Sequence, residues 1–421
     1  MKLLIVTSRF DLDEAGGASP ARELAEALAE RGWSVEVLTG MSKGSEDRSL
    51  RRGFWHVERR DRIRLVELSS SAIPLAVAGM LQRPDVIVSV RPVSITPSLG
   101  NACLTTALKV LWNCPVLTWV SAPSPSHSKR LSGLEPGWMH RFTERVKKFA
   151  YRNSERIAVG SKRLERQLIR GGVPENQLLQ IPKWANFSAL EPSSAVDAIR
   201  TRLGYLPGDF LLVYAGALTG NHGLETLILA MKRLEFRQDI HLLIAGDGPR
   251  RGSLEGAALR FGLKRVRFLG AAAMASFPEL MRAADLLLLS QSARLVDAVM
   301  PNKLPHYMAA GKPILAAVHA DGETAAWIES AACGVVVAPE FPPDIADAIL
   351  ELQALPVLRG RLGQAAANFA KSEFDKPRVI DRFEETINLL VAGRHPKTVS
   401  VARLPERETL SASAAAGSSK G

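Results

Sequence analysis

The stretch that decides the fold runs from residue 210 to residue 231 and reads FLLVYAGALTGNHGLETLILAM. Its first part, Phe210 to Tyr214, is a continuous apolar run, which is typical of a strand buried on both faces of a parallel sheet. A glycine-rich turn follows, and apolar residues at helical spacing from Leu224 to Met231 then predict a helix. Strand, glycine turn and helix together form the repeating unit of a doubly wound α/β domain.

The same alternation continues on the C-terminal side of this stretch. Further buried strands are predicted at His241 to Ala245, Val266 to Leu269, Asp285 to Leu289, Pro313 to Ala317 and Gly334 to Val337. Helical patterns separate these strands, and strands that alternate with helices imply a parallel sheet covered on both faces.

The N-terminal side repeats the rhythm. A strand is predicted at Leu3 to Val6, followed by a helix that Ser19 caps, that has Pro20 at its first position and that ends at Gly32. More strands are predicted from Val35 and at Asp85 to Val90, Pro115 to Val120 and Arg156 to Val159. Two such units in succession imply two doubly wound domains with a cleft between them.

Composition divides the chain further. The proline- and serine-bearing stretch Ser188 to Ala195 is the predicted linker, which gives an N-terminal domain at residues 1–190 and a C-terminal domain at residues 191–376. Residues 402–421 are rich in Ser, Ala and Gly and are predicted to be a disordered tail.

Charge and cysteine content limit which cellular compartment and which binding partners fit the sequence. The net charge of +11 favours anionic partners, and two clusters of Arg and Lys fall between residues 51 and 62 and between residues 129 and 152. Aromatic residues suited to base stacking are sparse, so an anionic membrane surface ranks above nucleic acid, and no nucleic acid is expected; a solvated surface stays as the alternative. The three cysteines lack metal-ligand spacing, the N-terminus lacks the pattern of a secretory signal, and no apolar run reaches ~18 residues. These observations favour a cytoplasmic protein.

Loops after the strands are where an open parallel sheet binds ligands. Gly16 and Gly17 follow the first strand and would let the backbone approach an anion or a sugar, although a plain tight turn fits them equally. Asp11-Leu12-Asp13 resembles the metal-binding motif D-x-D, but a hydrated surface loop is favoured there. No metal site is therefore expected.

The C-terminal loops carry the stronger signals. The turn from Ala215 to Gly223 joins glycines, His222 and a helix start, a combination that suits a diphosphate; an exposed loop histidine is the alternative. Gly246 lies in the sharp turn Ala245 to Pro249, which brings backbone to the cleft, and Asp247 there is interpreted as a structural turn residue.

The stretch MPNKLPHYMAAGKP at residues 300–313 is the most informative about function. A short helix predicted from about Lys303 would direct free amides and an ammonium group at one point. The alternative is a solvated lysine at a helix start.

These motifs together resemble glycosyltransferase family 4, and most closely its bacterial exopolysaccharide, O-antigen and colanic-acid-type branch. The motifs that carry the resemblance are Gly16-Gly17, Tyr-Ala-Gly at 214–216, Gly-Leu-Glu-Thr-Leu at 223–227, Ala-Gly-Asp-Gly-Pro at 245–249 and Tyr-Met-Ala-Ala-Gly-Lys-Pro at 307–313. The resemblance implies a GT-B fold, in which two Rossmann-like domains face a central cleft. It also implies a metal-independent, retaining reaction without a cofactor, a UDP- or GDP-sugar donor held by the C-terminal domain, an acceptor domain at the N-terminus and a helix at 377–392 that crosses back.

Residue roles follow from the resemblance. Gly16 and Gly17 match the glycine loop at the reaction centre. The residues that match donor-binding positions are Gly216, Asn221, His222, Gly246, Asn302, Lys303 and Glu323. Asn302 and Lys303 belong to the Pro-Asn-Lys element, and Glu323 to a Gly-Glu pair.

The sequence also departs from the family. Two family glutamates fall at Ala298 and His306, and neither position keeps a carboxylate. A ring nitrogen of His306 would replace one of them as an acceptor from ribose hydroxyls, and Asp297 is the candidate to replace the other. Ser121 stands where an acidic residue is usual, and His127 is the nearby candidate to enter the cleft.

Three hypotheses follow. The first is a hexosyl- or aminosugar transferase that acts on a lipid-linked glycan acceptor, as a peripheral protein at the inner face of the plasma membrane, in cell-surface polysaccharide synthesis. The second is a nucleotide-sugar epimerase on the same fold, which the thin supply of carboxylates disfavours. The third is a catalytically degenerate glycosyltransferase-like partner protein, which the two missing glutamates favour.

Overall fold

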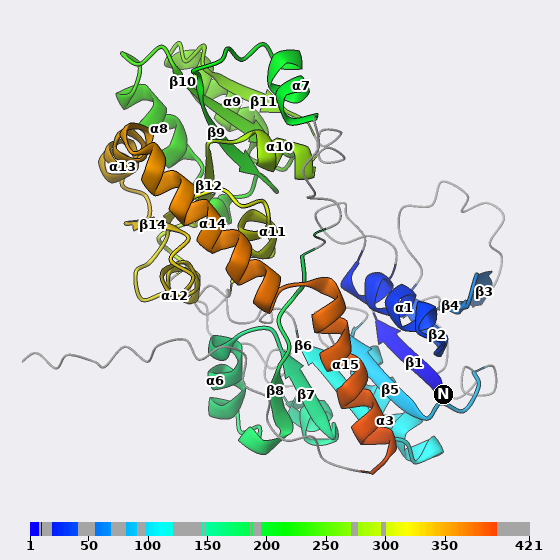
Figure 1. The fold of residues 1–421 in the computed structure, drawn as a ribbon. Helices are drawn as coiled ribbons and strands as arrows, with labels where there is room; N and C mark the ends of the chain where they lie inside the picture. The colour runs from blue at the N-terminus through cyan, green and yellow to red at the C-terminus, as the bar shows by residue number, and fades with distance from the viewer. Residues whose placement is uncertain are drawn as a thin grey trace, which may run out of the picture.

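The computed structural model describes residues 1–7, 10, 19–40, 55–68, 81–90, 98–120, 145–146, 148–185, 187, 195–270, 277–295 and 300–393. These residues form two α/β units in succession, each built on its own sheet (Figure 1). The predicted tail at 402–421 lies outside the described residues, as do most of the predicted linker and part of each basic cluster.

The N-terminal unit is built on an eight-stranded sheet with the order β3-β4-β2-β1-β5-β6-β7-β8. All neighbours are parallel except β3 and β4, which form an antiparallel hairpin at one edge. Its strands are β1 (Lys2–Thr7), β2 (Ser34–Gly40), β3 (Trp55–Arg60), β4 (Ile63–Leu68), β5 (Val86–Val90), β6 (Val116–Val120), β7 (Arg156–Val159) and β8 (Leu178–Gln180). Its helices include α1 (Pro20–Glu30), α3 (Ser98–Trp112) and α6 (Lys162–Arg170).

The C-terminal unit is built on a six-stranded parallel sheet with the order β11-β10-β9-β12-β13-β14. Its strands are β9 (Phe210–Ala215), β10 (Ile240–Ala245), β11 (Val266–Leu269), β12 (Leu286–Ser290), β13 (Ile314–Ala317) and β14 (Gly334–Val337). Its helices are α7 (Ala195–Arg202), α8 (Glu225–Arg233), α9 (Arg251–Arg260), α10 (Phe277–Ala283), α11 (Leu304–Ala309), α12 (Glu323–Ser330), α13 (Pro342–Ala354) and α14 (Pro356–Glu373).

Burial explains why the apolar runs form strands. Every residue of β5, β6, β9 and β12 is buried, as expected for strands covered by helices on both faces. The first helix also forms as predicted: the Ser19 side chain accepts a hydrogen bond from the Arg22 amide, and Leu24 and Leu28 enter the core.

Three strands escape the sequence prediction. β3 and β4 lie in a stretch that carries Glu58, Arg59, Arg60 and Arg64, so their pattern lacks the apolar run of a doubly covered strand. β3 forms nonetheless because it is an edge strand, where charged side chains stay in solvent. β8 has only three residues, too few for a periodic signal.

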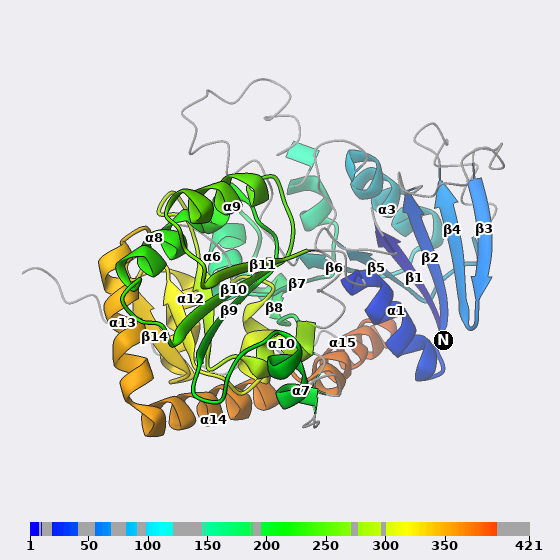
Figure 2. The ribbon, with the colours of Figure 1, turned by 90° about the horizontal axis from the view of Figure 1, so that it is seen from above.

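The last helix, α15 (Lys376–Val391), packs on the N-terminal unit although it follows the C-terminal one (Figures 1 and 2). Val379, Phe383 and Ile387 are buried in the N-terminal core. The Phe383 ring lies 4.8 Å from that of Trp119 and 6.4 Å from that of Trp184. The chain therefore crosses twice between the units.

The two crossings lie side by side. The amide of Ala185 donates to the carbonyl of Phe374 at 2.7 Å, and Ala185 bridges to Asp375. Within the described residues, the structure contains no helix that is both long and apolar enough to cross a bilayer.

Candidate functional site

Lys303 lies at the centre of the candidate site. It immediately precedes α11, and its Nζ lies 3.8 Å from the centroid of the Tyr214 ring at the end of β9. This nitrogen is buried and has no hydrogen-bond partner among the residues that the structure describes. Burial lowers the pKa of the amine to about 7. A solvated lysine is therefore excluded.

Gly216 makes room for that amine. Its φ of 145° is a conformation that other residues rarely adopt, and a Cβ at this position would lie 2.7 Å from Lys303 Nζ. The Gly216 amide donates to the carbonyl of Ala245, so the glycine contributes space and not a free donor. A larger residue would displace Lys303.

Tyr307 fixes the start of α11 against β9. Its buried hydroxyl accepts a hydrogen bond from the Ala215 amide at 2.9 Å and donates to the Ala215 carbonyl at 3.2 Å. Tyr214 is equally buried, and its hydroxyl donates to the carbonyl of Ala217 at 2.9 Å. The sequence interpretation gave neither tyrosine a role: Tyr214 provides the ring over which Lys303 Nζ lies, and Tyr307 fixes the helix that follows Lys303. The available signal was a tyrosine near the end of an apolar strand and a second tyrosine one helical turn after Lys303.

His222 flanks the same aromatic ring. Its ring centroid lies 6.1 Å from that of Tyr214, and its Nδ1 lies 3.1 Å from Thr219 Oγ1. Burial, with the positive charge of Lys303 as the second cause, lowers the pKa of His222 to about 4. Two groups that can carry positive charge are thus held together without an acidic partner among the described residues. Such a pair favours an anion.

The second glycine turn lies directly against the first. Gly246 has a φ of 143°, and a Cβ there would lie 2.0 Å from the Gly216 carbonyl oxygen. The carbonyl of Asp247 accepts from the Leu218 amide at 2.8 Å, and its Oδ1 accepts from the Gly248 amide at 2.7 Å. Asp247 thus stabilises the turn, as predicted.

The helix after the first turn begins within one residue of its predicted start at Leu224. Residues 220–222 form a single 3-10 turn, Gly223 adopts a φ of 55°, and α8 starts at Glu225. Glycine at 223 permits this reversal before the helix. Asn221 is exposed, and its carbonyl accepts from the Ser292 amide at 2.9 Å.

Asn302 and His306 lie at the border with the N-terminal unit. Asn302 Oδ1 accepts from Lys183 Nζ at 2.5 Å. The His306 ring packs on Phe277 at 6.0 Å, and burial lowers its pKa while the opposing Glu23 carboxylate raises it. Glu23 stands in the first turn of α1 and accepts from Trp184 Nε1 at 2.5 Å.

Glu323 also faces the N-terminal unit. Burial raises the pKa of this carboxyl, and the nearby Ser161 hydroxyl and Arg163 amide at the start of α6 lower it in part. Neither carboxylate oxygen reaches a hydrogen bond of normal geometry. Glu323 therefore contributes a contact between the units.

The four candidates for the reaction centre, Gly16, Gly17, His127 and Asp297, lie outside the described residues, as do Asp11, Asp13, Ser121 and Ala298. Within the described part of the chain, no group of three His, Cys, Asp or Glu side chains is arranged to hold a metal ion.

Comparison with solved structures defines the class. Two parallel α/β units with a crossing C-terminal helix are the GT-B fold. A structure of Anabaena HepE in complex with UDP superposes with a TM-score of 0.71 at 18% identity, covering 92% of this chain and 100% of that one. Sucrose-phosphate synthase from Thermosynechococcus elongatus gives 0.71 at 19% identity over 93% and 99% of the two chains.

Sequence comparison places the chain within that class. Residues 15–184 match the glycosyl transferase 4-like domain, and residues 209–354 match glycosyl transferases group 1. The chain belongs to glycosyltransferase family 4. It is 25% identical over 234 residues to a putative colanic acid biosynthesis glycosyl transferase, WcaI, of Escherichia coli. The aligned region covers 55% of this chain and 56% of that protein. It is 26% identical over 258 residues to an alpha-D-kanosaminyltransferase of Streptomyces kanamyceticus, over 59% and 65% of the two. The matches thus span little more than half of these relatives' length.

Proposed function

We propose that this protein transfers a hexose or amino sugar from a UDP- or GDP-sugar to a glycan acceptor, in the synthesis of a cell-surface polysaccharide. The observation that carries the proposal is the buried, unpartnered amine of Lys303 beside the glycine turn and His222. A solved relative in fold, HepE, is described in complex with UDP-glucose, which supports a nucleotide-sugar donor.

The chemistry follows from charge. When the bond between the sugar and the diphosphate breaks, negative charge grows on the phosphate oxygens. A diphosphate beside Lys303 raises the pKa of the amine and keeps it protonated, so the ammonium stabilises the leaving group where a metal would otherwise act. The proposed reaction needs no cofactor and retains the configuration of the sugar, as the family resemblance implies.

Binding and turnover test this proposal together. We expect UDP or GDP to raise the midpoint of thermal unfolding of the full chain by mass action. Lys303→Ala should abolish most of that shift and lower turnover at least tenfold, in line with a loss of about 3 kcal/mol for one such contact. Lys232→Ala removes an exposed lysine of the same unit and should change neither. Normal turnover of the Lys303 variant at saturating donor would refute the assignment.

A non-catalytic partner protein is the second candidate, because His306 stands where the family has a glutamate and packs on Phe277 at the border between the units. A degenerate cleft would bind neither UDP nor GDP nor their sugars in a calorimetric titration. A nucleotide-sugar epimerase would instead convert its donor with no acceptor present, which product analysis detects.

We also propose that the acceptor is lipid-linked and that the protein works at the inner face of the plasma membrane. The N-terminal unit exposes Val110 and Leu111 at the end of α3 by 77% and 59%, and Phe149 by 55% beside Lys148 and Arg152. Exposed apolar side chains among cations suit an anionic bilayer surface.

Phe149→Ser should weaken co-sedimentation with acidic vesicles, whereas Phe236→Ser, which changes an exposed phenylalanine of the other unit, should not. Binding that ignores both salt and acidic lipid would contradict this.

A further inference from the structure

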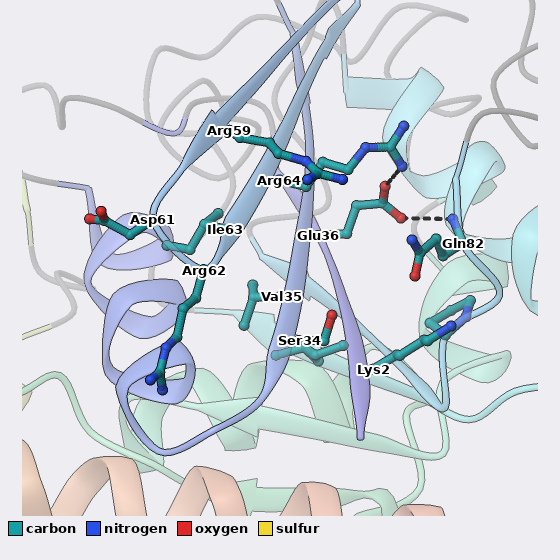
Figure 3. Close-up of a pocket in the computed structure, with 12 residues that line it drawn as sticks. Lys2, Ser34, Val35, Glu36, Arg59, Asp61, Arg62, Ile63, Arg64 and Gln82 are labelled. Carbon is teal, nitrogen blue, oxygen red and sulfur yellow. Dashed lines mark hydrogen bonds and ion pairs between the residues drawn. The ribbon is translucent and has the colours of Figure 1, made fainter.

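A second polar pocket lies in the N-terminal unit, at the amino ends of the strands. Lys2 begins β1, Ser34 begins β2, and the β3–β4 hairpin contributes Arg59, Arg62 and Arg64 (Figure 3). The ligand-binding edge of such a sheet is the opposite one, where the strands end. This pocket is therefore separate from the glycosyltransferase site.

Register places its charges on one face of the sheet. Glu36 is aligned with Arg64, and Arg64 with Arg59, so these three side chains project to the same side of adjacent strands. Lys2 lies on that face too, because Leu4 is the residue aligned with Glu36 and side chains two apart on a strand point alike. Figure 3 shows Arg59 and Arg64 extending alongside each other above Glu36.

The acidic residue at the centre is already engaged. Both Glu36 oxygens are used, one by the Arg64 guanidinium and one by the Gln82 amide at 3.0 Å. The side chain is buried, and burial raises the pKa of its carboxyl. Glu36 therefore holds Arg64 in place, and no ion pair joins it to Arg59 among the described residues.

Within the described residues Arg59 has no carboxylate partner, whereas the positive charge of Lys2 acts on the Glu36 carboxylate. Arg59 stands directly opposite Arg64 in an antiparallel pair, an arrangement in which like charges destabilise a sheet. By contrast, the next residue, Arg60, points to the other face and pairs with Glu58 at 2.8 Å. Two guanidinium groups on facing residues, with Lys2 lining the same pocket, favour an oxyanion, which a guanidinium can contact bidentately.

We propose that this pocket binds a phosphate group, held by Arg59, Arg64 and Lys2. The phosphate would bridge the two guanidinium groups and relieve their repulsion. Its source is either a soluble phosphate compound or the headgroup of an anionic phospholipid.

Thermal unfolding of the full chain in inorganic phosphate tests the site. Compared with chloride at equal ionic strength, phosphate should raise the unfolding midpoint of the wild type with a saturable dependence on concentration. Arg59→Gln should weaken the apparent phosphate affinity at least tenfold. Arg60→Gln removes the same charge from the same strand on the opposite face and should retain the wild-type response. In phosphate-free, low-salt buffer, Arg59→Gln should also unfold at a higher temperature than the wild type, because the facing charges are gone.

Vesicles distinguish the two sources. If flotation with phosphatidylglycerol vesicles depends on Arg59 and inorganic phosphate competes with it, the ligand is a lipid headgroup. If only the unfolding shift depends on Arg59, the ligand is a soluble phosphate. A phosphate effect that is absent, or that Arg59→Gln leaves intact, overturns the proposal. UDP or GDP binding at the Lys303 site should be unchanged in Arg59→Gln. The phosphate pocket and the proposed nucleotide site can therefore be tested, and refuted, separately.

Discussion

The proposed function needs a buried amine at Lys303, and burying that amine lowers the free energy of unfolding of the protein. Burial holds the pKa of its amine at about 7, against 10.5 for an ordinary lysine. Between these two values the unfolded chain binds more protons than the folded one, so the contribution of this group to the free energy of unfolding rises with pH. The buried charge is therefore most unfavourable below pH 7.

Lys303→Met should reveal that cost, because it keeps the length of the side chain and removes the charge. We expect the variant to be more stable than the wild type by a few kcal/mol at pH 6, at about 1.4 kcal/mol per unit of pKa depression, with the difference shrinking towards pH 10. Denaturant unfolding at several pH values measures it. Lys232→Met, at an exposed position, should show no pH-dependent difference. A constant advantage of the Lys303 variant across the pH range would contradict a buried, titrating amine.

For individual residues, the sequence indicated which side chains lie near one another but not how deeply they are buried or how their pKa values shift. Lys303, Gly216, His222 and Gly246 were all chosen from loops that follow strands, and the fold brings them together. Their loss of solvent depends on Tyr214 and Tyr307, which reach the site from a strand and a helix far apart in the sequence. Side-chain burial of this kind is a tertiary property that no local pattern reports.

Among the elements, α11 depends on one side chain for its placement. Tyr307 exchanges two hydrogen bonds with the backbone of Ala215, where β9 ends. Removing the hydroxyl leaves buried backbone groups without this partner, at a cost of about 1–3 kcal/mol. Since α11 begins directly after Lys303, looser packing also displaces the amine.

Tyr307→Phe should therefore lower stability and weaken UDP or GDP binding several-fold, while the bound state keeps the same nucleotide preference. Titration calorimetry and denaturant unfolding measure the two effects. Tyr205→Phe is the matched control, because the Tyr205 hydroxyl is buried in the same unit without a hydrogen bond of normal geometry. Equal losses in both variants would mean that the Tyr307 hydroxyl has no special role in positioning.

Element prediction succeeded where burial alone sets the pattern. The strands from β9 to β14 lie within about one residue of their predicted bounds, because the inner strands are buried and apolar and the partly exposed edge strands β11 and β14 remain mostly apolar. The β3–β4 hairpin was missed because its charges, Arg59 and Arg64 among them, hide a strand at the sheet edge. The 3-10 turn at Gly220–His222 was missed because the left-handed φ of Gly223, which follows it, is a property of backbone angles.

At the scale of the whole molecule, two polar contacts join the units beside the double crossing of the chain. Lys183 donates to Asn302, and the Glu323 carboxylate lies at the start of α6 near Ser161 and Arg163. Within the described residues, a backbone hydrogen bond at Ala185 joins the two crossings, and α15 is packed in the N-terminal core. Polar contacts thus contribute to the relative placement of the units, and polar interfaces between domains permit domain motion.

Removing both contacts should loosen this placement without unfolding either unit. We expect the double variant Lys183→Ala, Glu323→Ala to show a larger radius of gyration in small-angle scattering and a several-fold lower kcat/KM for the acceptor. Because Glu323 also matches a donor-binding position, the acceptor kinetics are measured at saturating UDP- or GDP-sugar, so that weaker donor binding does not contribute to the result. A double variant that removes one cation and one carboxylate of an exposed ion pair, Arg250→Ala with Glu225→Ala, controls for the loss of charge. If the scattering profile and the acceptor kinetics match those of the wild type, closure of the units is set by the chain crossing alone and the two contacts are incidental.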